Sequence, residues 1–267
     1  MSTLPKEPAT DYETVRPTLG TGDLFFLHGK SDAGVMVENL EQMEGWPPYS
    51  HIGMVIADED NLFFWDAPGD GGLCFPDPYA SDPDNRIYGK YTNFDGAHPG
   101  CRVSVLDDVL AYYFTAITPD MPGFWLRQLQ PAVTPDRFGA LRKFINRVDG
   151  MPFPTGPGTL PFGFTLPPEV SGLGANFLAG QDRASFFFGT YFCAQLVADS
   201  YMRMGLLDME LFPPNGYTPA AFTMDNTIRL PLISPATLGP VTFVKWNGTA
   251  KTQPCKCPDY NPPPPAN

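Results

Sequence analysis

The chain has 267 residues, of which 43% are hydrophobic and 13% aromatic, and its formal net charge at pH 7 is −12. Such a composition can bury a sizeable core. An acidic chain offers little positive surface to phosphate groups, so we expect neither nucleic acid nor an anionic membrane surface as a partner. The 32 prolines and 26 glycines should divide the chain into short elements joined by long loops.

Targeting signals and disulfides are not indicated by the sequence. There is no apolar run long enough to span a membrane and no apolar signal core near residue 1, so we expect a soluble protein without a transmembrane segment or signal peptide. It would be cytoplasmic or, if of viral or phage origin, part of a virion or a delivered effector. The five cysteines are dispersed and odd in number, which favours free thiols in a reducing compartment. Cys255 and Cys257 lack a second ligand pair nearby, so exposed thiols are preferred there to a zinc site.

The first part of the chain predicts a small set of strands. Residues 1–18 are polar without periodicity and are expected to form an arm. A turn leads into a buried strand within 22–27, and residues 32–45 have the apolar spacing of a possible helix. Residues 51–57 and 62–67 are rich in β-forming side chains and are separated by four polar residues, which predicts a β-hairpin.

The middle of the chain alternates between loop composition and regular elements. Residues 68–100 are dense in Gly, Pro, Asp and Asn, which is unusually long for a loop in one domain. A strand is predicted at 103–106, with a possible helix over 107–115. Thr134 followed by a proline marks the start of a helix whose apolar stripe continues to Gly150.

The last regular elements surround a cysteine. A strong amphipathic helix carries Cys193 in its first turn, with Thr190 as the expected cap and Gly205 as the terminator. Strands are expected at 228–233 and 241–246.

Cys193 is the candidate nucleophile. A thiol reacts as its anion, which the positive end of a helix dipole and a neighbouring imidazolium both favour. A cysteine on the apolar face of a helix is commonly an unreactive core residue, so a catalytic interpretation requires a histidine beside it. Among the three histidines, His51 opens a strand after a Pro-rich loop, where the base of a papain-like enzyme would sit. His28 and His98 follow the pattern of solvent-facing loop residues.

Pairing across the predicted hairpin supplies a third residue. If the turn is centred on 59–60, facing residue numbers add to 119, so Gly53 faces Asp66 and His51 faces Pro68. Asp66 then lies diagonally from His51 on one face of the sheet, at about 7 to 8 Å between Cα atoms. The glycine at 53 should leave the space between them open. A carboxylate in this position would orient the imidazole and stabilise its charged form.

These pieces, in this order, resemble the circularly permuted branch of the NlpC-type papain-like cysteine hydrolases, which includes YiiX-like proteins and is related to lecithin:retinol acyltransferases. The matching segments are 22–26, 50–55 and 191–197, together with the acidic residue Asp66. In unpermuted relatives the cysteine helix precedes the histidine strand, whereas here the histidine comes 142 residues before the cysteine. This chain departs from the family pattern where Ala-Gln replaces Ser-Glu after the cysteine, and where the acid is aspartate instead of glutamate.

The resemblance implies an α+β, permuted papain-like fold in which an antiparallel sheet packs on the cysteine helix. The hydrolase domain would span 19–248, with insertions at about 68–134 and 151–188, followed by a Pro-rich tail at 249–267. It also implies a Cys193, His51 and Asp66 triad, with the backbone amide of Cys193 in the oxyanion site and no cofactor or metal. Tyr191, beside the nucleophile, is a weaker candidate for substrate or oxyanion contact.

Three classes of function stay open. The first is a thiol hydrolase acting on an amide, ester or thioester carbonyl of a peptide, a peptidoglycan-type substrate or an acyl lipid. The second is a non-catalytic structural or binding protein on the same fold, such as a virion or secretion-assembly component, with protein partners held by the Pro-rich loops and tail. The third, a metal-dependent hydrolase, fits least, since no His-Glu-x-x-His helix is present, and neither a phosphate loop nor a dinucleotide fingerprint occurs.

Overall fold

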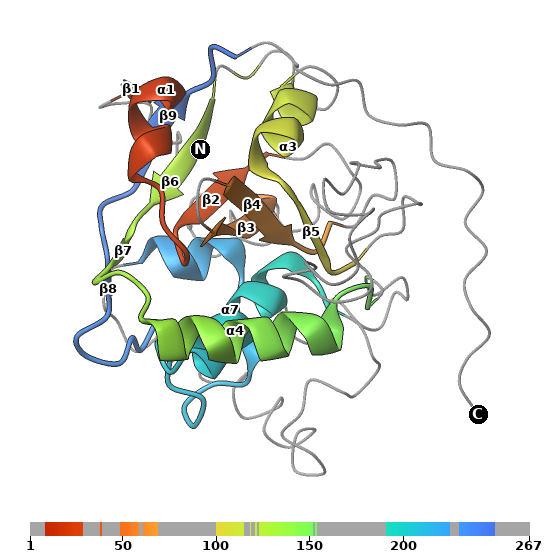
Figure 1. Ribbon diagram of the computed structural model, residues 1–267, viewed down its shortest axis with the longest axis vertical. Helices are drawn as coiled ribbons and strands as arrows, with labels where there is room; N and C mark the ends of the chain where they lie inside the picture. The colour runs from red at the N-terminus through yellow and green to blue at the C-terminus, as the bar shows by residue number, and fades with distance from the viewer. Residues whose placement is uncertain are drawn as a thin grey trace, which may run out of the picture.

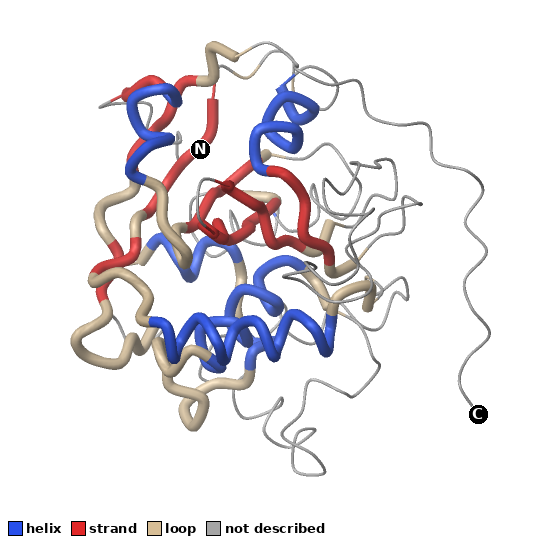
Figure 2. The backbone as a smooth tube through the Cα atoms, viewed as in Figure 1, coloured by secondary structure: helices blue, strands red, loops and turns tan. Residues whose placement is uncertain are grey.

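The computed structural model describes part of the chain as an α+β fold: a seven-stranded sheet with helices on both faces (Figures 1 and 2). The described residues are 9–28, 38, 49–58, 61–68, 100–114, 118, 121, 123–151, 153, 191–224 and 230–248. The predicted helix over 32–45, apart from Glu38, lies outside these residues. So do His98, Thr190, Cys255, Cys257, the tail at 249–267 and nearly all of the expected insertion at 151–188.

The sheet is antiparallel between all neighbours except the first two strands. From one edge to the other its strands are β1 (Ala9–Asp11), β9 (Thr242–Lys245), β6 (Gly123–Arg127), β2 (Leu24–Leu27), β3 (His51–Asp58), β4 (Asn61–Asp66) and β5 (Arg102–Val105). A separate two-stranded sheet joins β7 (Leu129–Gln130) to β8 (Thr237–Leu238). The centre of the large sheet, β2–β3–β4, is therefore covered on both edges.

Each face of the sheet has its own hydrophobic core. Helices α4 (Pro135–Val148) and α7 (Cys193–Arg203) lie together on one side of the central strands, and α3 (Leu106–Tyr112) lies on the other with α1 (Tyr12–Val15), as Figure 1 shows. The alternation of a strand sends Met54 of β3 to the α7 side and Val55 to the α3 side. Three short 3-10 turns complete the described elements: Arg16–Thr18, Pro214–Gly216 and Pro219–Thr223.

Helix α7 is held against the sheet by polar contacts as well as by burial. All of its residues except Arg203 are buried. The indole of Trp65 in β4 donates to the hydroxyl of Ser200 at 3.0 Å, and the hydroxyl of Tyr201 donates to the backbone carbonyl of Gly22. These contacts tie the helix to two different strand regions, so its first residue occupies a fixed place relative to the strand ends.

The hairpin prediction is confirmed, including its register. Met54 pairs with Trp65 and Asp58 with Asn61, so facing residue numbers add to 119 as expected. The helix predicted after Thr134 is α4, and the Thr134 hydroxyl accepts from the backbone N–H of Arg137 at 3.5 Å. The predicted strands within 22–27, 103–106 and 241–246 correspond to β2, β5 and β9, and the helix over 107–115 to α3.

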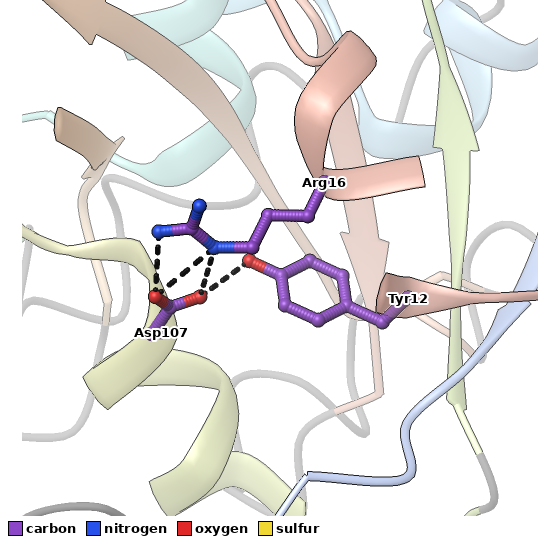
Figure 3. Close-up of polar contacts among 3 residues, drawn as sticks. All are labelled: Tyr12, Arg16 and Asp107. Carbon is purple, nitrogen blue, oxygen red and sulfur yellow. Dashed lines mark hydrogen bonds and ion pairs between the residues drawn. The ribbon is translucent and has the colours of Figure 1, made fainter. Parts of the chain in front are cut away.

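Residues 9–18 differ from the expected arm because they join the fold. Strand β1 pairs in parallel with β9, and the side chains of Tyr12 and Val15 are buried. The Tyr12 hydroxyl donates to Asp107 at 2.6 Å, and Arg16 pairs with the same carboxylate at 2.9 Å (Figure 3). Two apolar side chains are too few to give a periodic signal, so tertiary contacts decide the structure of this segment.

The segment 68–134 differs from the expected insertion because it supplies elements of the sheet itself. Strand β6 lies between β2 and β9, and all five of its residues are buried. A strand buried on both faces shows no polar alternation, which removes the sequence signal. The strand expected at 228–233 is absent from the described part, 230–233, where an isolated bridge joins Leu207 to Leu232.

Candidate active site

Three neighbouring strands place polar side chains at the same end of the sheet. His51 is the first residue of β3, Asp66 is the last residue of β4, and Arg102 is the first residue of β5. Because neighbouring strands run in opposite directions, the start of β3, the end of β4 and the start of β5 lie at the same end of the sheet. All three side chains are buried, and Asp66 and Arg102 are directly paired in the ladder.

The carboxylate of Asp66 uses its two oxygens for two partners. Oδ2 lies 3.0 Å from Nε2 of His51, and Oδ1 accepts from Nε of Arg102 at 3.2 Å. The contact between His51 and Asp66 expected from the hairpin register is therefore present. A buried carboxylate requires such partners, because burial without them is costly.

The space above Gly53 is filled and not open, contrary to the expectation from sequence. A Cβ atom added at Gly53 would lie 2.1 Å from Cζ of Phe64. The ring of Phe64 also meets the His51 ring edge to face at 6.4 Å between centroids. His51 also stacks on Tyr113, with centroids 6.1 Å apart and an interplanar angle of 14°. Glycine is needed here so that an aromatic ring can lie beside the imidazole and hold its plane.

Cys193 occupies the first position of α7, and the N-cap is Phe192 in place of the expected Thr190. Phe192 has extended backbone angles, and its N–H donates to Oε1 of Gln195 at 3.5 Å. The glutamine three residues after the cap thus accepts from the N–H of the cap residue, which is the half of a capping box that needs no hydroxyl. The first N–H groups of a helix have no intrahelical partner, so Cys193 lies at the positive end of the helix dipole.

Cys193 and His51 meet where the two cores join at the strand ends. Cys193 belongs to the core on the α7 side, while the rings that pack on His51 belong to the core on the α3 side. Burial disfavours the charged form of His51, but hydrogen bonds to Asp66 and to Cys193 outweigh it and raise the pKa of His51 to about 10. His51 is therefore expected to carry a proton at neutral pH.

The other described cysteine provides a contrast. Cys101 is fully buried, and burial together with the nearby carboxylates of Asp149 and Asp66 raises the pKa of its thiol. Cys101 is not among the groups that raise the pKa of His51. Of the two described thiols, only Cys193 is paired with an imidazole.

The hydroxyl of Tyr191 donates to Oδ2 of Asp199 at 2.8 Å, and Asp199 also accepts from Nε of Arg203 at 3.0 Å. A tyrosine has one hydroxyl hydrogen to donate. Tyr191 therefore braces the start of α7 against its own helix, and the hydrogen of its hydroxyl is used in this contact.

The remaining histidine in the described residues lies elsewhere. His28 contacts Glu38 at 2.5 Å through Nδ1 and packs edge to face on Trp125. Its side chain is 20% exposed, so it is partly buried and not the solvent-facing residue expected from sequence. The residue that sequence reasoning missed is Arg102. A lone arginine opening the strand next to the one that carries Asp66 is the signal that could have indicated it.

Comparison of the chain with protein-family models and with curated proteins finds no match. Within the described residues, no helix has the length and apolarity to cross a membrane, and no group of three or more metal-ligating side chains gathers.

Proposed function

We propose that the protein is a thiol hydrolase in which Cys193 is the nucleophile, His51 the general acid and base, and Asp66 the residue that orients His51. The observation that carries the proposal is the position of His51, whose Nε2 lies 3.0 Å from Oδ2 of Asp66 and whose pKa is raised by Asp66 and Cys193 together. Since Nε2 faces Asp66, Nδ1 is the nitrogen left for the thiol. A helix N-terminus beside a protonated imidazole is the environment that favours a thiolate.

The reaction follows from these groups. The thiolate of Cys193 attacks a carbonyl carbon, forming a C–S bond, and the intermediate collapses as His51 gives its proton to the departing nitrogen, oxygen or sulfur. Water then attacks the resulting thioester while His51 takes the proton of that water, and the thiolate leaves. The backbone N–H of Cys193, without a partner inside the helix, would stabilise the oxyanion in both steps.

The family-level part of the proposal is a permuted papain-like fold. Its support is the chain order, in which strand β3 with His51 precedes helix α7 with Cys193, and the packing of α7 on β3 and β4. Amide, ester and thioester substrates are all compatible with this chemistry, including peptides, peptidoglycan-type peptides and acyl lipids.

Trapping an acyl-enzyme tests the proposal without knowledge of the natural substrate. The protein is incubated with p-nitrophenyl acetate, and acetylation is located by peptide mass spectrometry in the native chain, Cys193→Ala and His51→Ala. In the native chain we expect rapid acetylation of Cys193. Acetylation should be about a hundredfold slower in His51→Ala, and Cys193→Ala should show no early release of p-nitrophenolate. Acetylation distributed among exposed residues, with none selective for Cys193, would instead favour the non-catalytic structural or binding protein.

A further inference from the structure

A buried charge that contacts the candidate triad has no role in it so far. Arg102 is 1% exposed, and its Nε donates to the oxygen of Asp66 that His51 does not use. The two residues face each other in the β4–β5 ladder, so their backbones fix the approach of the guanidinium. Placing an arginine in the interior is costly unless its charge is compensated, and its partner here is the residue that orients the imidazole.

We propose that Arg102 is a positioning residue that completes a four-membered chain of alternating charge: Cys193 thiolate, His51 imidazolium, Asp66 carboxylate and Arg102 guanidinium. This inference rests on the proposed function, because it assigns Arg102 a part in that reaction. Arg102 would act through Asp66 and would touch no reacting atom.

Charge balance gives Arg102 its effect. Without it, the thiolate, imidazolium and carboxylate together would carry one net negative charge in a buried site, and protonation of the thiolate would relieve that charge. With it, the four groups are neutral when the thiol is ionised. Arg102 also remains a positive partner of Asp66 at the moment when His51 has given its proton to a leaving group and no longer offers a positive charge.

Other charged groups near the site do not supply this balance. Asp149, at the end of α4, and Asp199, in α7, both act electrostatically on Cys101, and each is an acid. The cation paired with Asp199 is Arg203, which contacts that carboxylate at 3.0 Å. Tyr113 meets His51 with its ring face. Arg102 is a permanent cation in direct contact with Asp66.

The test measures the rate at which iodoacetamide alkylates Cys193 as a function of pH, with the alkylated residue identified by peptide mass spectrometry. The midpoint is the pH at which this rate is half of its plateau value. Arg102→Gln keeps a donor but loses the charge, and Arg102→Lys keeps the charge but loses the planar guanidinium. We expect the midpoint to rise by about one pH unit or more in Arg102→Gln, which slows alkylation about tenfold at pH values below it. Arg102→Lys should recover most of the native midpoint. A midpoint in Arg102→Gln equal to that of the native chain overturns the proposal.

A double-mutant cycle shows whether Arg102 acts through Asp66. In an Asp66→Asn background, adding Arg102→Gln should shift the midpoint less than Arg102→Gln does in the native chain. If Arg102→Gln alone does not fold, Arg102→Lys provides the comparison: it keeps the charge and should keep the midpoint, and a shifted midpoint there contradicts the charge-balance role. A full shift that persists without Asp66 contradicts the assignment.

The two proposals fail in different ways. If native Cys193 shows no dependence on His51, the thiol hydrolase itself falls. If Cys193 depends on His51 but is indifferent to the charge at position 102, only the role of Arg102 falls.

Discussion

The imidazole of His51 and the carboxylate of Asp66 meet across the β3–β4 pair, with 3.0 Å between Nε2 and Oδ2. The residues are diagonal neighbours in a hairpin whose register is fixed by five directly paired positions. Both side chains are buried, so water does not compete for this hydrogen bond. The relationship makes Asp66 the residue through which the sheet controls the imidazole.

Replacing Asp66 by asparagine should reduce Cys193 reactivity while leaving the fold in place. The amide keeps the size of the side chain but cannot stabilise an imidazolium with a negative charge. We expect alkylation of Cys193 at neutral pH to slow by about tenfold or more, measured by peptide mass spectrometry beside thermal unfolding. Native-like alkylation in a folded Asp66→Asn protein would remove Asp66 from the proposed triad.

The protonation of His51 can be followed directly by NMR of the imidazole nitrogens. The chain has only three histidines, so the signal of His51 is assigned by its loss in His51→Gln. We expect this ring to stay protonated through neutral pH and to titrate near pH 10, because hydrogen bonds to Asp66 and Cys193 outweigh its burial. A midpoint close to the ordinary value of about 6.5 would show that the two hydrogen bonds do not hold the proton.

The raised pKa of His51 also predicts how stability depends on pH. Cys193→Ser removes the titration of the thiol while His51 keeps its contact with Asp66. A histidine with a raised pKa in the folded state stabilises fully below its unfolded value of about 6.5, and this contribution is lost as the pH rises toward the folded value. Because Cys193→Ser also removes the share of the pKa rise that Cys193 contributes, the free energy of unfolding should fall above pH 6.5 only as far as the contact with Asp66 outweighs burial, at a slope below about 1.4 kcal/mol per pH unit.

The control for this measurement is Cys193→Ser combined with His51→Gln, compared by urea unfolding between about pH 6 and 9. The slope above pH 6.5 should flatten in the double variant, since the group that titrates is gone. Equal slopes in the two proteins would mean that His51 does not couple folding to proton uptake.

Gly53→Ala should destabilise the protein although it adds a single methyl group. The new Cβ would lie 2.1 Å from the ring of Phe64, which must then move away from His51. Overpacking of this kind costs about 1–3 kcal/mol, and Phe64→Leu should relieve part of it in the double variant. Denaturant unfolding of the four proteins in this cycle measures the coupling, and additive effects would show that the two residues do not clash.

Asp107→Ala should loosen residues 9–18 without disturbing Cys193. It removes the shared acceptor of Tyr12 and Arg16 (Figure 3). Because the ion pair is partly exposed, the loss should be about 1 kcal/mol. Faster hydrogen exchange in residues 9–18 with unchanged alkylation of Cys193 is the expected result, whereas unchanged exchange would show that this contact does not secure the segment.

The candidate site could be predicted from sequence where a local rule applied. The period of the strands and the polar turn fix the hairpin register, and the register alone places Asp66 beside His51. Long-range partners follow no such rule. Arg102 reaches Asp66 only because β5 returns beside β4, and the chain between these strands, residues 67–101, gives no pairing signal in its composition.

The fold was harder to predict where burial erased the pattern. Strand β6 is buried on both faces and therefore shows no alternation, so its position between β2 and β9 could not be read from residues 123–127. The start of α7 was misplaced for another reason. Phe192, the cap residue, has no capping hydroxyl, and its backbone N–H instead donates to Gln195 inside the helix.

The most direct test of the account is the rate of Cys193 alkylation by iodoacetamide as a function of pH, in the native protein and in His51→Ala, with Cys101 as the internal comparison. We predict that native Cys193 is alkylated at neutral pH much faster than the buried Cys101, that this reactivity is lost in His51→Ala, and that Cys101 stays slow in both proteins. A Cys193 that is silent at every pH, or that reacts equally with and without His51, would contradict the Cys193–His51 pair on which the proposed hydrolase depends.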